Sequence, residues 1–96
     1  MDIVVTYDVN TSDAQGERRL REIAKICEGF GVRRQKSVFE CRLSESQLLR
    51  MLIDLESVMD KTVDSVIVYH LAGDASQCRR QLGRSISQEL GAPWVL

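Results

Sequence analysis

A run of β-branched hydrophobic positions stands at the start of the chain. Ile3, Val4 and Val5 are stiff at χ1 and favour a strand that is covered on both faces. Asp8 follows at the end of this stretch, with no cation beside it in sequence, and a polar turn comes after it. The pattern predicts a central strand over residues 3–9 that ends in a carboxylate.

A helical period follows this strand. Ser12 and Gln15 match a capping box, which predicts a helix start near Asp13, although Gly16 weakens the first turn. Apolar residues then recur at helical spacing and predict one buried helix face, made by Leu20, Ile23, Cys27 and Phe30.

The apolar residues in the segment 31–43 do not recur at helical spacing. Phe39, Cys41 and Leu43 alternate with polar or smaller residues, as in a half-buried strand. A shorter strand over residues 32–35 precedes it, and Lys36-Ser37 leaves room only for a tight turn. We expect an antiparallel hairpin, and a single bulged strand is the alternative.

A second helix and a last strand complete the pattern. Ser44 and Gln47 form another capping box. The apolar stripe that follows is Leu48, Leu52, Leu55 and Met59, widened by Leu49, Met51 and Ile53. A turn at residues 60–62 leads to a strand over residues 63–71.

The element order is therefore β-α-β-β-α-β, which predicts an α+β fold. In the ferredoxin-like arrangement, both helices cover one face of an antiparallel sheet and the first strand is central. We expect a ferredoxin-like domain over residues 1–72 and a C-terminal tail over residues 73–96. The tail is polar, with one or two short helical turns expected within residues 76–90. Its apolar end predicts an extended segment that adds to a sheet edge, preferably that of a partner.

Composition narrows the function classes. The chain has 96 residues, 13 basic against 14 acidic, so no global charge draws it to nucleic acid or a membrane. Three widely spaced cysteines and one histidine argue against a zinc site and a disulfide framework, and suggest a reducing compartment. With no apolar run near the roughly 20 residues that span a bilayer, we expect a cytoplasmic protein.

Two candidate residues carry possible chemistry. Asp8 either serves a site at the end of the strand or only forms an Asx-turn and caps the next helix, and the residues favour neither. His70 is the sole imidazole, and a structural role is expected for it.

Several segments together resemble the CRISPR-associated protein 2 family, the small partner of the CRISPR spacer-integration machinery. These segments are Y-D-V at 7–9, R-R-L at 18–20, G-V-R-R-Q-K-S-V-F-E-C at 31–41 and D-S-V-I-V-Y at 64–69. The match covers about residues 1–71 in register, and the Q-K-S-V-F-E block is its most specific part.

The resemblance implies a homodimer that bridges dimers of the integrase, CRISPR-associated protein 1, and holds protospacer DNA. It also implies a magnesium-dependent endonuclease that acts on single-stranded RNA or duplex DNA, with Asp8 as catalytic residue and Mg²⁺ ligand. The C-terminal segment is expected to cross to the neighbouring subunit. The expected dimer-interface residues are Tyr7, Phe39, Trp94, Val95 and Leu96, although Tyr7, on the face opposite Asp8, is alternatively expected in the core.

The basic residues suit contacts to a phosphate backbone more than stacking on bases, because few aromatic residues lie among them. The expected nucleic-acid-binding residues are Arg18, Arg19, Arg21, Lys25, Arg33, Arg34 and Lys36, and the alternative is that they form ordinary solvated faces. Three functions remain open: a non-catalytic scaffold for spacer acquisition, a nuclease centred on Asp8, and a small regulatory ligand-binding module.

Overall fold

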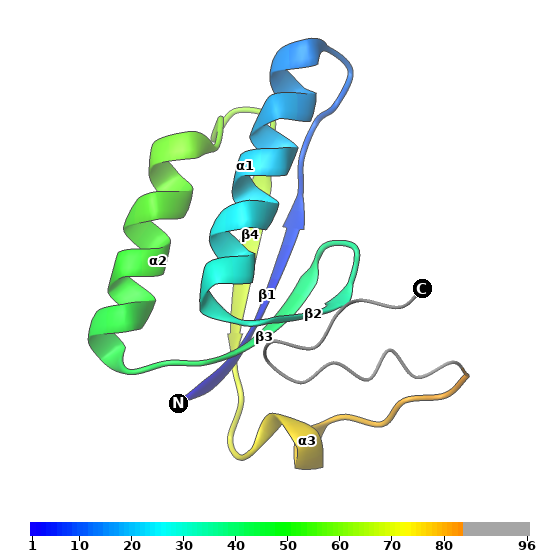
Figure 1. The fold of residues 1–96 in the computed structure, drawn as a ribbon, viewed down its shortest axis with the longest axis vertical. Coiled ribbons are helices and arrows are strands. Elements are labelled where there is room, and N and C mark those ends of the chain that lie inside the picture. The colour runs from blue at the N-terminus through cyan, green and yellow to red at the C-terminus, as the bar shows by residue number, and fades with distance from the viewer. Residues whose placement is uncertain (84–96) are drawn as a thin grey trace.

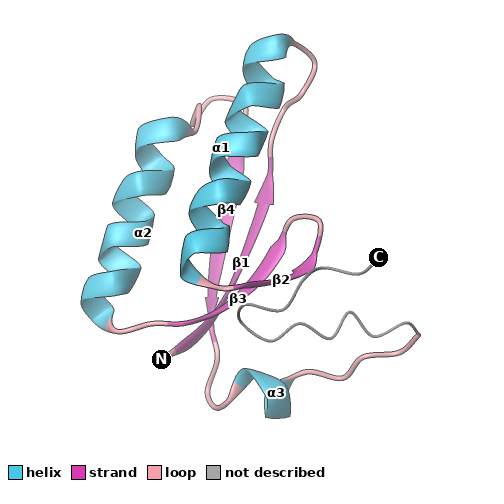
Figure 2. Ribbon diagram, in the orientation of Figure 1, coloured by secondary structure: helices cyan, strands magenta, loops and turns pink. Residues whose placement is uncertain are grey.

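The fold is known from a computed structural model, in which residues 1–83 are described. Figures 1 and 2 show one antiparallel sheet with two long helices packed side by side on one of its faces. In chain order the elements are β1 (Asp2–Asp8), α1 (Ala14–Phe30), β2 (Val32–Gln35), β3 (Val38–Arg42), α2 (Glu45–Val58), β4 (Ser65–His70) and α3 (Ala75–Cys78). The predicted βαββαβ order and ferredoxin-like fold are confirmed.

The sheet has the strand order β2-β3-β1-β4, which places β1 in the interior as predicted. Along the β1–β4 pair, Asp8 lies opposite Ser65 and Ile3 lies opposite His70. The hairpin prediction is also confirmed, with an irregularity in the pairing between Arg33 and Gln35. The alternative of a single bulged strand is thereby excluded.

Strand β1 is covered on one face only within the described part of the chain. Ile3, Val5 and Tyr7 are buried beneath the helices, whereas Asp8 at the end of the other set is exposed. The prediction of a strand covered on both faces is therefore not met within residues 1–83. The β-branched run indicated a strand correctly, but it could not indicate which layers would cover it.

The predicted capping box is present at the start of α2 but absent at the start of α1. At α2, Ser44 Oγ accepts from the Gln47 backbone N–H and Gln47 Oε1 accepts from the Ser44 N–H, so the capping box is confirmed. At α1, the N-cap is Asp13, whose carboxylate accepts from the Gly16 N–H at 2.8 Å. The capping box predicted at Ser12 is wrong, because the helix begins one residue later.

The core lies between the sheet and the two helices. Its fully buried side chains include Phe39 from β3 and Met51 and Leu55 from α2. Leu49 and Ile53, which were expected to widen the α2 stripe, are exposed instead because they lie on the outer side of the helix. The other residues of this core are Ile3, Val5, Tyr7, Val9, Ile23, Cys27, Cys41 and Leu43.

Tyr7 and Phe39 belong to this core and not to an outer surface, which corrects their expected place at a dimer interface. Their rings stack with centroids 6.2 Å apart, and the Tyr7 hydroxyl donates to the Lys36 carbonyl. Phe39 has no exposed surface and Tyr7 almost none. Side chains packed under their own helices leave nothing for a second chain to contact.

The helical turn α3 overlaps the region of residues 76–90 where short helical turns were expected, but it begins one residue earlier, at Ala75. Trp94, Val95 and Leu96, expected at the interface, lie outside the described residues. No helix within residues 1–83 is long and apolar enough to cross a membrane.

Candidate functional site at the end of strand β1

Asp8 is exposed at the last position of β1. Within residues 1–83 its carboxylate has no hydrogen-bond or ion-pair partner. Other residues perform the local roles considered for Asp8: Asp13 caps α1, and the Asn10 side chain accepts from the Ser12 N–H at 3.0 Å. Among residues 1–83, no side chain or backbone group therefore competes with a cation for the Asp8 carboxylate.

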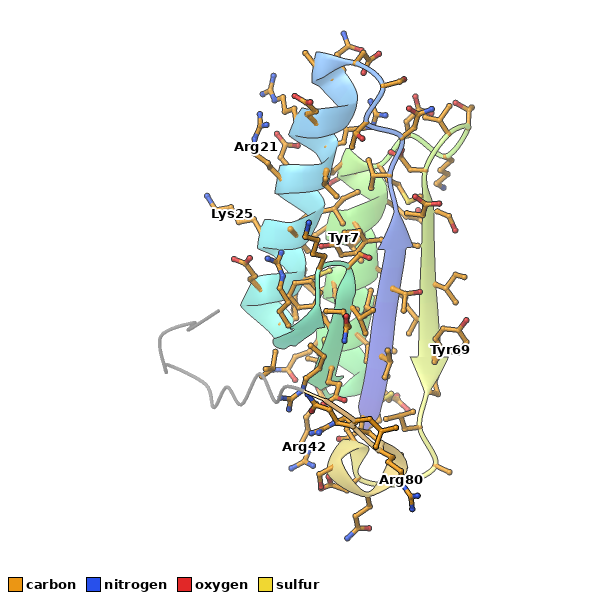
Figure 3. The ribbon with its side chains drawn as sticks, turned by 90° about the vertical axis from the view of Figure 1, so that its right-hand side faces the viewer. Tyr7, Arg21, Lys25, Arg42, Tyr69 and Arg80 are labelled. Carbon is orange, nitrogen blue, oxygen red and sulfur yellow. The ribbon has the colours of Figure 1, made fainter. Side chains whose placement is uncertain are left out.

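The sheet face opposite the helices carries a mainly apolar patch that the described residues leave partly exposed, whereas Glu40, opposite Val4 on the same side, pairs with Arg34 and Arg79. We call this patch the open face, made by Val4, Thr6, Val38, Ile67 and Tyr69, which share one side through direct strand pairing. Ile67 and Tyr69 keep 46 % and 52 % of their surface exposed. Figure 3 shows Tyr69 pointing away from the helices and Tyr7 pointing toward them. Because the side chains of a strand alternate, Asp8 lies at the end of the open face.

The buried carboxylate of Asp64, which precedes the strand partner of Asp8, forms hydrogen bonds to three segments of the chain. The Asp64 side chain has no exposed surface and accepts from Arg19 Nε at 2.8 Å. It also accepts from the backbone N–H groups of Asn10 at 3.1 Å and Asp60 at 2.9 Å. The hydrogen bond from Arg19 holds the pKa of this carboxyl below its usual value, against the opposing effect of burial. We call these four residues the Asp64 cluster.

Sequence reasoning assigned no role to Asp64. The available signal was an acidic residue immediately before an apolar strand, in the segment D-S-V-I-V-Y. A charge at such a position is buried only when it is paired, so a cation from elsewhere in the chain was required. The sequence separation of 45 residues between Arg19 and Asp64 hid that partner.

Four of the seven candidate nucleic-acid-binding residues make ion pairs within the chain. Arg19 bonds to Asp64, and Arg18 pairs with Glu22 along α1. The remaining two lie on the hairpin: Arg33 lies over the Phe39 ring and pairs with Glu28, and Arg34 pairs with Glu40.

The other three candidates, Arg21, Lys25 and Lys36, have no acidic partner within residues 1–83. Arg21 and Lys25 are one helical turn apart and project together from the outer side of α1 (Figure 3). The structure therefore leaves a small cationic surface on α1 and at the hairpin turn, not the full predicted set.

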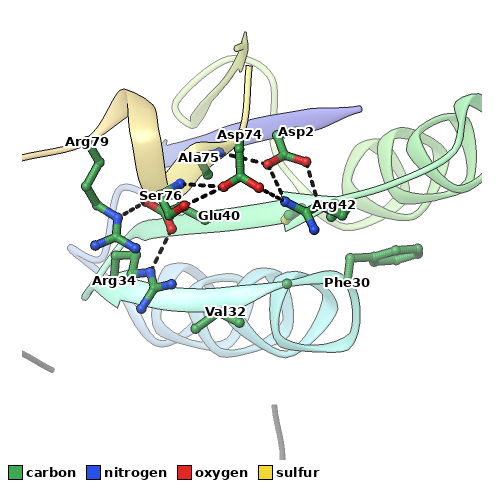
Figure 4. Close-up of a pocket in the computed structure, with 12 residues that line it drawn as sticks. Asp2, Phe30, Val32, Arg34, Glu40, Arg42, Asp74, Ala75, Ser76 and Arg79 are labelled. Carbon is green, nitrogen blue, oxygen red and sulfur yellow. Dashed lines mark hydrogen bonds and ion pairs between the residues drawn. The ribbon is translucent and has the colours of Figure 1, made fainter. Parts of the chain in front are cut away.

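A pocket of about 320 Å³ lies between the hairpin and α3. Figure 4 shows its charged groups in two ion-paired sets, one with Glu40 between Arg34 and Arg79, the other with Arg42 between Asp2 and Asp74. Arg42 and the Ala75 N–H lower the pKa of Asp2 to about 2. The three cations are matched by three anions, so the pocket presents no net charge to a ligand.

No cluster of three or more potential metal-ligating side chains is present in the described part of the chain. His70 pairs with Ile3, at the opposite end of the β1–β4 ladder from Asp8 and Ser65. Because a strand advances about 3.3 Å per residue, roughly 16 Å separates the two ends. His70 is thus too far from Asp8 to act on the same substrate atom within one chain.

The structure is that of a ferredoxin-like α+β protein, in which an exposed carboxylate at the end of β1 has no partner within residues 1–83. The family model described as CRISPR associated protein Cas2 matches residues 1–82. This chain belongs to that family.

Relatives and solved structures agree with this assignment. CRISPR-associated endoribonuclease Cas2 1 of Moorella thermoacetica is 38% identical over 96 residues, which is all of both chains. CRISPR-associated endonuclease Cas2 of Halalkalibacterium halodurans is 37% identical and aligns over 97% of each chain. The crystal structure of Streptococcus pyogenes Cas2 has a TM-score of 0.79 and 37% identity, and covers 86% of this chain and 100% of that one.

Proposed function

We propose that this chain acts in CRISPR adaptation as a homodimer that bridges integrase dimers and holds protospacer DNA, with a magnesium-dependent endonuclease activity at Asp8. The observation that carries the proposal is the position of Asp8. It is an exposed, unpartnered carboxylate within residues 1–83, at the end of the apolar open face. The endoribonuclease and endonuclease names of the relatives support the nuclease part.

The open face supports a dimer in which two copies pack sheet against sheet. A sheet face with Ile67 and Tyr69 about half exposed gains stability when apolar surface leaves water. A two-fold interface uses the same patch on both copies, so it would bring the two Asp8 residues toward one axis. This arrangement would supply the second carboxylate that the described part of one chain lacks.

The site fits Mg²⁺ as an oxygen-ligated ion. Mg²⁺ prefers carboxylate oxygens and retains several waters, so one free carboxylate from each chain is a sufficient protein contribution. The cation bound there would supply charge stabilisation for a phosphodiester and acidify a coordinated water. Asp8 would hold the ion, and the hydrophobic residues of the open face beside it would limit access of bulk water.

Phosphate contacts are assigned to Arg21, Lys25 and Lys36. Cations that already form ion pairs must give up a partner to bind a phosphate, whereas these three have none within residues 1–83. Contacts of this type position a nucleic acid without reading its bases. A dimer would present the three residues twice, on two equivalent surfaces.

A purely structural scaffold is the second candidate function. It is favoured by the distance from Asp8 to His70, which leaves no imidazole base near the carboxylate within one chain. Hydrolysis and scaffolding are compatible, since the proposed cation ligand, Asp8, and the proposed phosphate contacts, Arg21, Lys25 and Lys36, are different residues.

The test compares Asp8→Ala with Asp54→Ala, which removes a partly exposed carboxylate that pairs with Arg50 on α2. We expect Asp8→Ala to abolish Mg²⁺-dependent cleavage of single-stranded RNA and duplex DNA, with the dimer mass unchanged in light scattering and spacer acquisition retained in cells. Asp54→Ala should match wild type in all assays. Cleavage that survives Asp8→Ala would refute the nuclease site, and loss of acquisition by an intact dimer would refute the separate scaffold role.

A further inference from the structure

The backbone of Asn10, two residues beyond Asp8, is held at both its N–H and its carbonyl group. The Asn10 N–H donates to Asp64 Oδ1 at 3.1 Å, and the Asn10 carbonyl accepts from Arg19 Nη2 at 3.4 Å. Arg19 also donates to both oxygens of Asp64, so the two side chains that hold the backbone of Asn10 are bonded to each other.

The Asp64 cluster also fixes the opposite strand. Ser65, the residue after Asp64, lies opposite Asp8 in the β1–β4 ladder. The Asp64 carboxylate therefore links the start of β4 to the segment that leaves β1. A fully buried carboxylate with four protein donors is rigid, because each donor would lose its partner if it moved.

Gly16 supplies an independent constraint on the backbone of Asn10. A Cβ atom built at Gly16 would lie 1.9 Å from the Asn10 carbonyl oxygen. Only a residue without a side chain allows α1 to approach the backbone so closely. The first turn of α1, the end of β1 and the start of β4 are thus packed against one another next to Asp8.

We infer that Asp64 and Arg19 are positioning residues for Asp8. They hold the backbone at the end of β1 so that the Asp8 carboxylate is already in place when a cation binds. Arg19 acts through its bonds to Asp64 and Asn10, in place of the phosphate contact that its sequence position suggested. The benefit is pre-organisation, because ordering the ligand beforehand removes an entropic cost from binding. This inference rests on the proposed function.

The test titrates the full-length protein with Mg²⁺ alone and follows the backbone amide signals of residues 8–10 by NMR. Cleavage assays give the Mg²⁺ concentration for half-maximal rate. The variants are Asp64→Asn, which removes the charge, and Arg19→Lys, which keeps the charge but loses the two-pronged contact. Arg50→Lys, at an exposed ion pair on α2, is the matched control.

Replacing residues that orient a metal ligand typically changes metal affinity or activity by about 10- to 100-fold. We expect Asp64→Asn to weaken Mg²⁺ binding within this range, with kcat restored at saturating Mg²⁺. Arg19→Lys should give a smaller shift in the same direction, and Arg50→Lys none. A merely structural role would lower the melting temperature without moving the Mg²⁺ dependence of the folded protein.

Different results would refute the magnesium site and the positioning role. If the amides of residues 8–10 in wild type do not respond to Mg²⁺, or respond equally in Asp8→Ala, the magnesium site itself is refuted and the positioning role with it. If wild type responds and a folded Asp64→Asn or Arg19→Lys protein has the wild-type Mg²⁺ dependence, only the positioning role is refuted. Arg19→Lys decides the question if Asp64→Asn does not fold.

Discussion

Arg19 and Asp64 join the first helix to the start of the last strand through a partly buried ion pair. Arg19 Nε lies 2.8 Å from Asp64 Oδ2, with 18% of the arginine side chain exposed and none of the aspartate. Because the same carboxylate accepts the Asn10 N–H, this pair connects the core of the fold to the segment that follows Asp8.

We first predict that the free energy of unfolding depends on pH through the Asp64 carboxyl. Its pKa in the folded protein is below the usual value of about 3.9, chiefly because of the hydrogen bond from Arg19. A lowered folded pKa contributes stability at pH values above the unfolded pKa, and this contribution is lost as pH falls through the folded pKa. Asp64→Asn should lower the free energy of unfolding at pH 7 by about 1–3 kcal/mol.

Urea unfolding between about pH 7 and pH 2 measures this effect, because the window extends on both sides of the ordinary carboxyl pKa. The wild-type stability should fall more steeply below about pH 4 than that of Asp64→Asn, so that the two curves converge in acid. Curves that stay parallel over the whole range would show that the Asp64 pKa is not lowered.

A pair of glycine substitutions in α1 should have opposite effects. Gly16→Ala places a Cβ against the Asn10 carbonyl and should destabilise the protein by about 1–3 kcal/mol. Gly29→Ala meets nothing within 4 Å and should stabilise the helix by about 0.5–1 kcal/mol. Thermal unfolding at neutral pH compares the two. A Gly16→Ala protein as stable as wild type would contradict the close approach of α1 to the end of β1.

The three cysteines should differ sharply in thiol reactivity. Burial raises the pKa of Cys27 to about 12 and that of Cys41 to about 11, whereas Cys78 is exposed. Since the thiolate is the reactive species, only Cys78 should react rapidly with a disulfide reagent at about pH 8. All three should react in guanidinium. Rapid reaction of two thiols in the native protein would place Cys27 or Cys41 outside the core.

The free cations of α1 should carry part of any nucleic-acid affinity. Arg21→Gln with Lys25→Gln should weaken duplex binding and reduce the slope of log K against log salt by about 0.9 for each phosphate that is no longer neutralised. Fluorescence anisotropy over a salt series measures both quantities. Arg50→Gln, whose arginine already pairs with Asp54 on α2, is the control and should leave the slope unchanged. Equal slopes for the α1 variant and wild type would remove this surface from the interface.

Local sequence signals predicted the elements well but not all of their ends. The Ser44 capping box was correct because both partners lie within one helical turn. At α1 two polar residues, Ser12 and Asp13, compete for the cap, and the close packing of Gly16 against Asn10 accompanies the start at Asp13. That contact belongs to the tertiary structure and leaves no mark on the local pattern.

The candidate site was predictable only in part. The polar residues after the apolar run indicated that Asp8 ends a strand, and the period of two along β1 places it on the face opposite Tyr7. Which arginines form ion pairs could not be predicted from the sequence, because the partners of Arg19 and Arg79 are 45 and 39 residues away in sequence. The burial of Tyr7 and Phe39 similarly depended on which sheet face receives the helices.

The central claim is that Asp8 binds a divalent cation at the end of the open face of a dimer. A crystal structure of the dimer soaked with Mg²⁺ tests it most directly. We expect Asp8 carboxylate oxygens from both copies at about 2.1 Å from a shared ion, with the open faces packed together. Asp8 carboxylates roughly 10 Å or more apart, too far to share an ion, or a dimer formed through another surface, would contradict the claim.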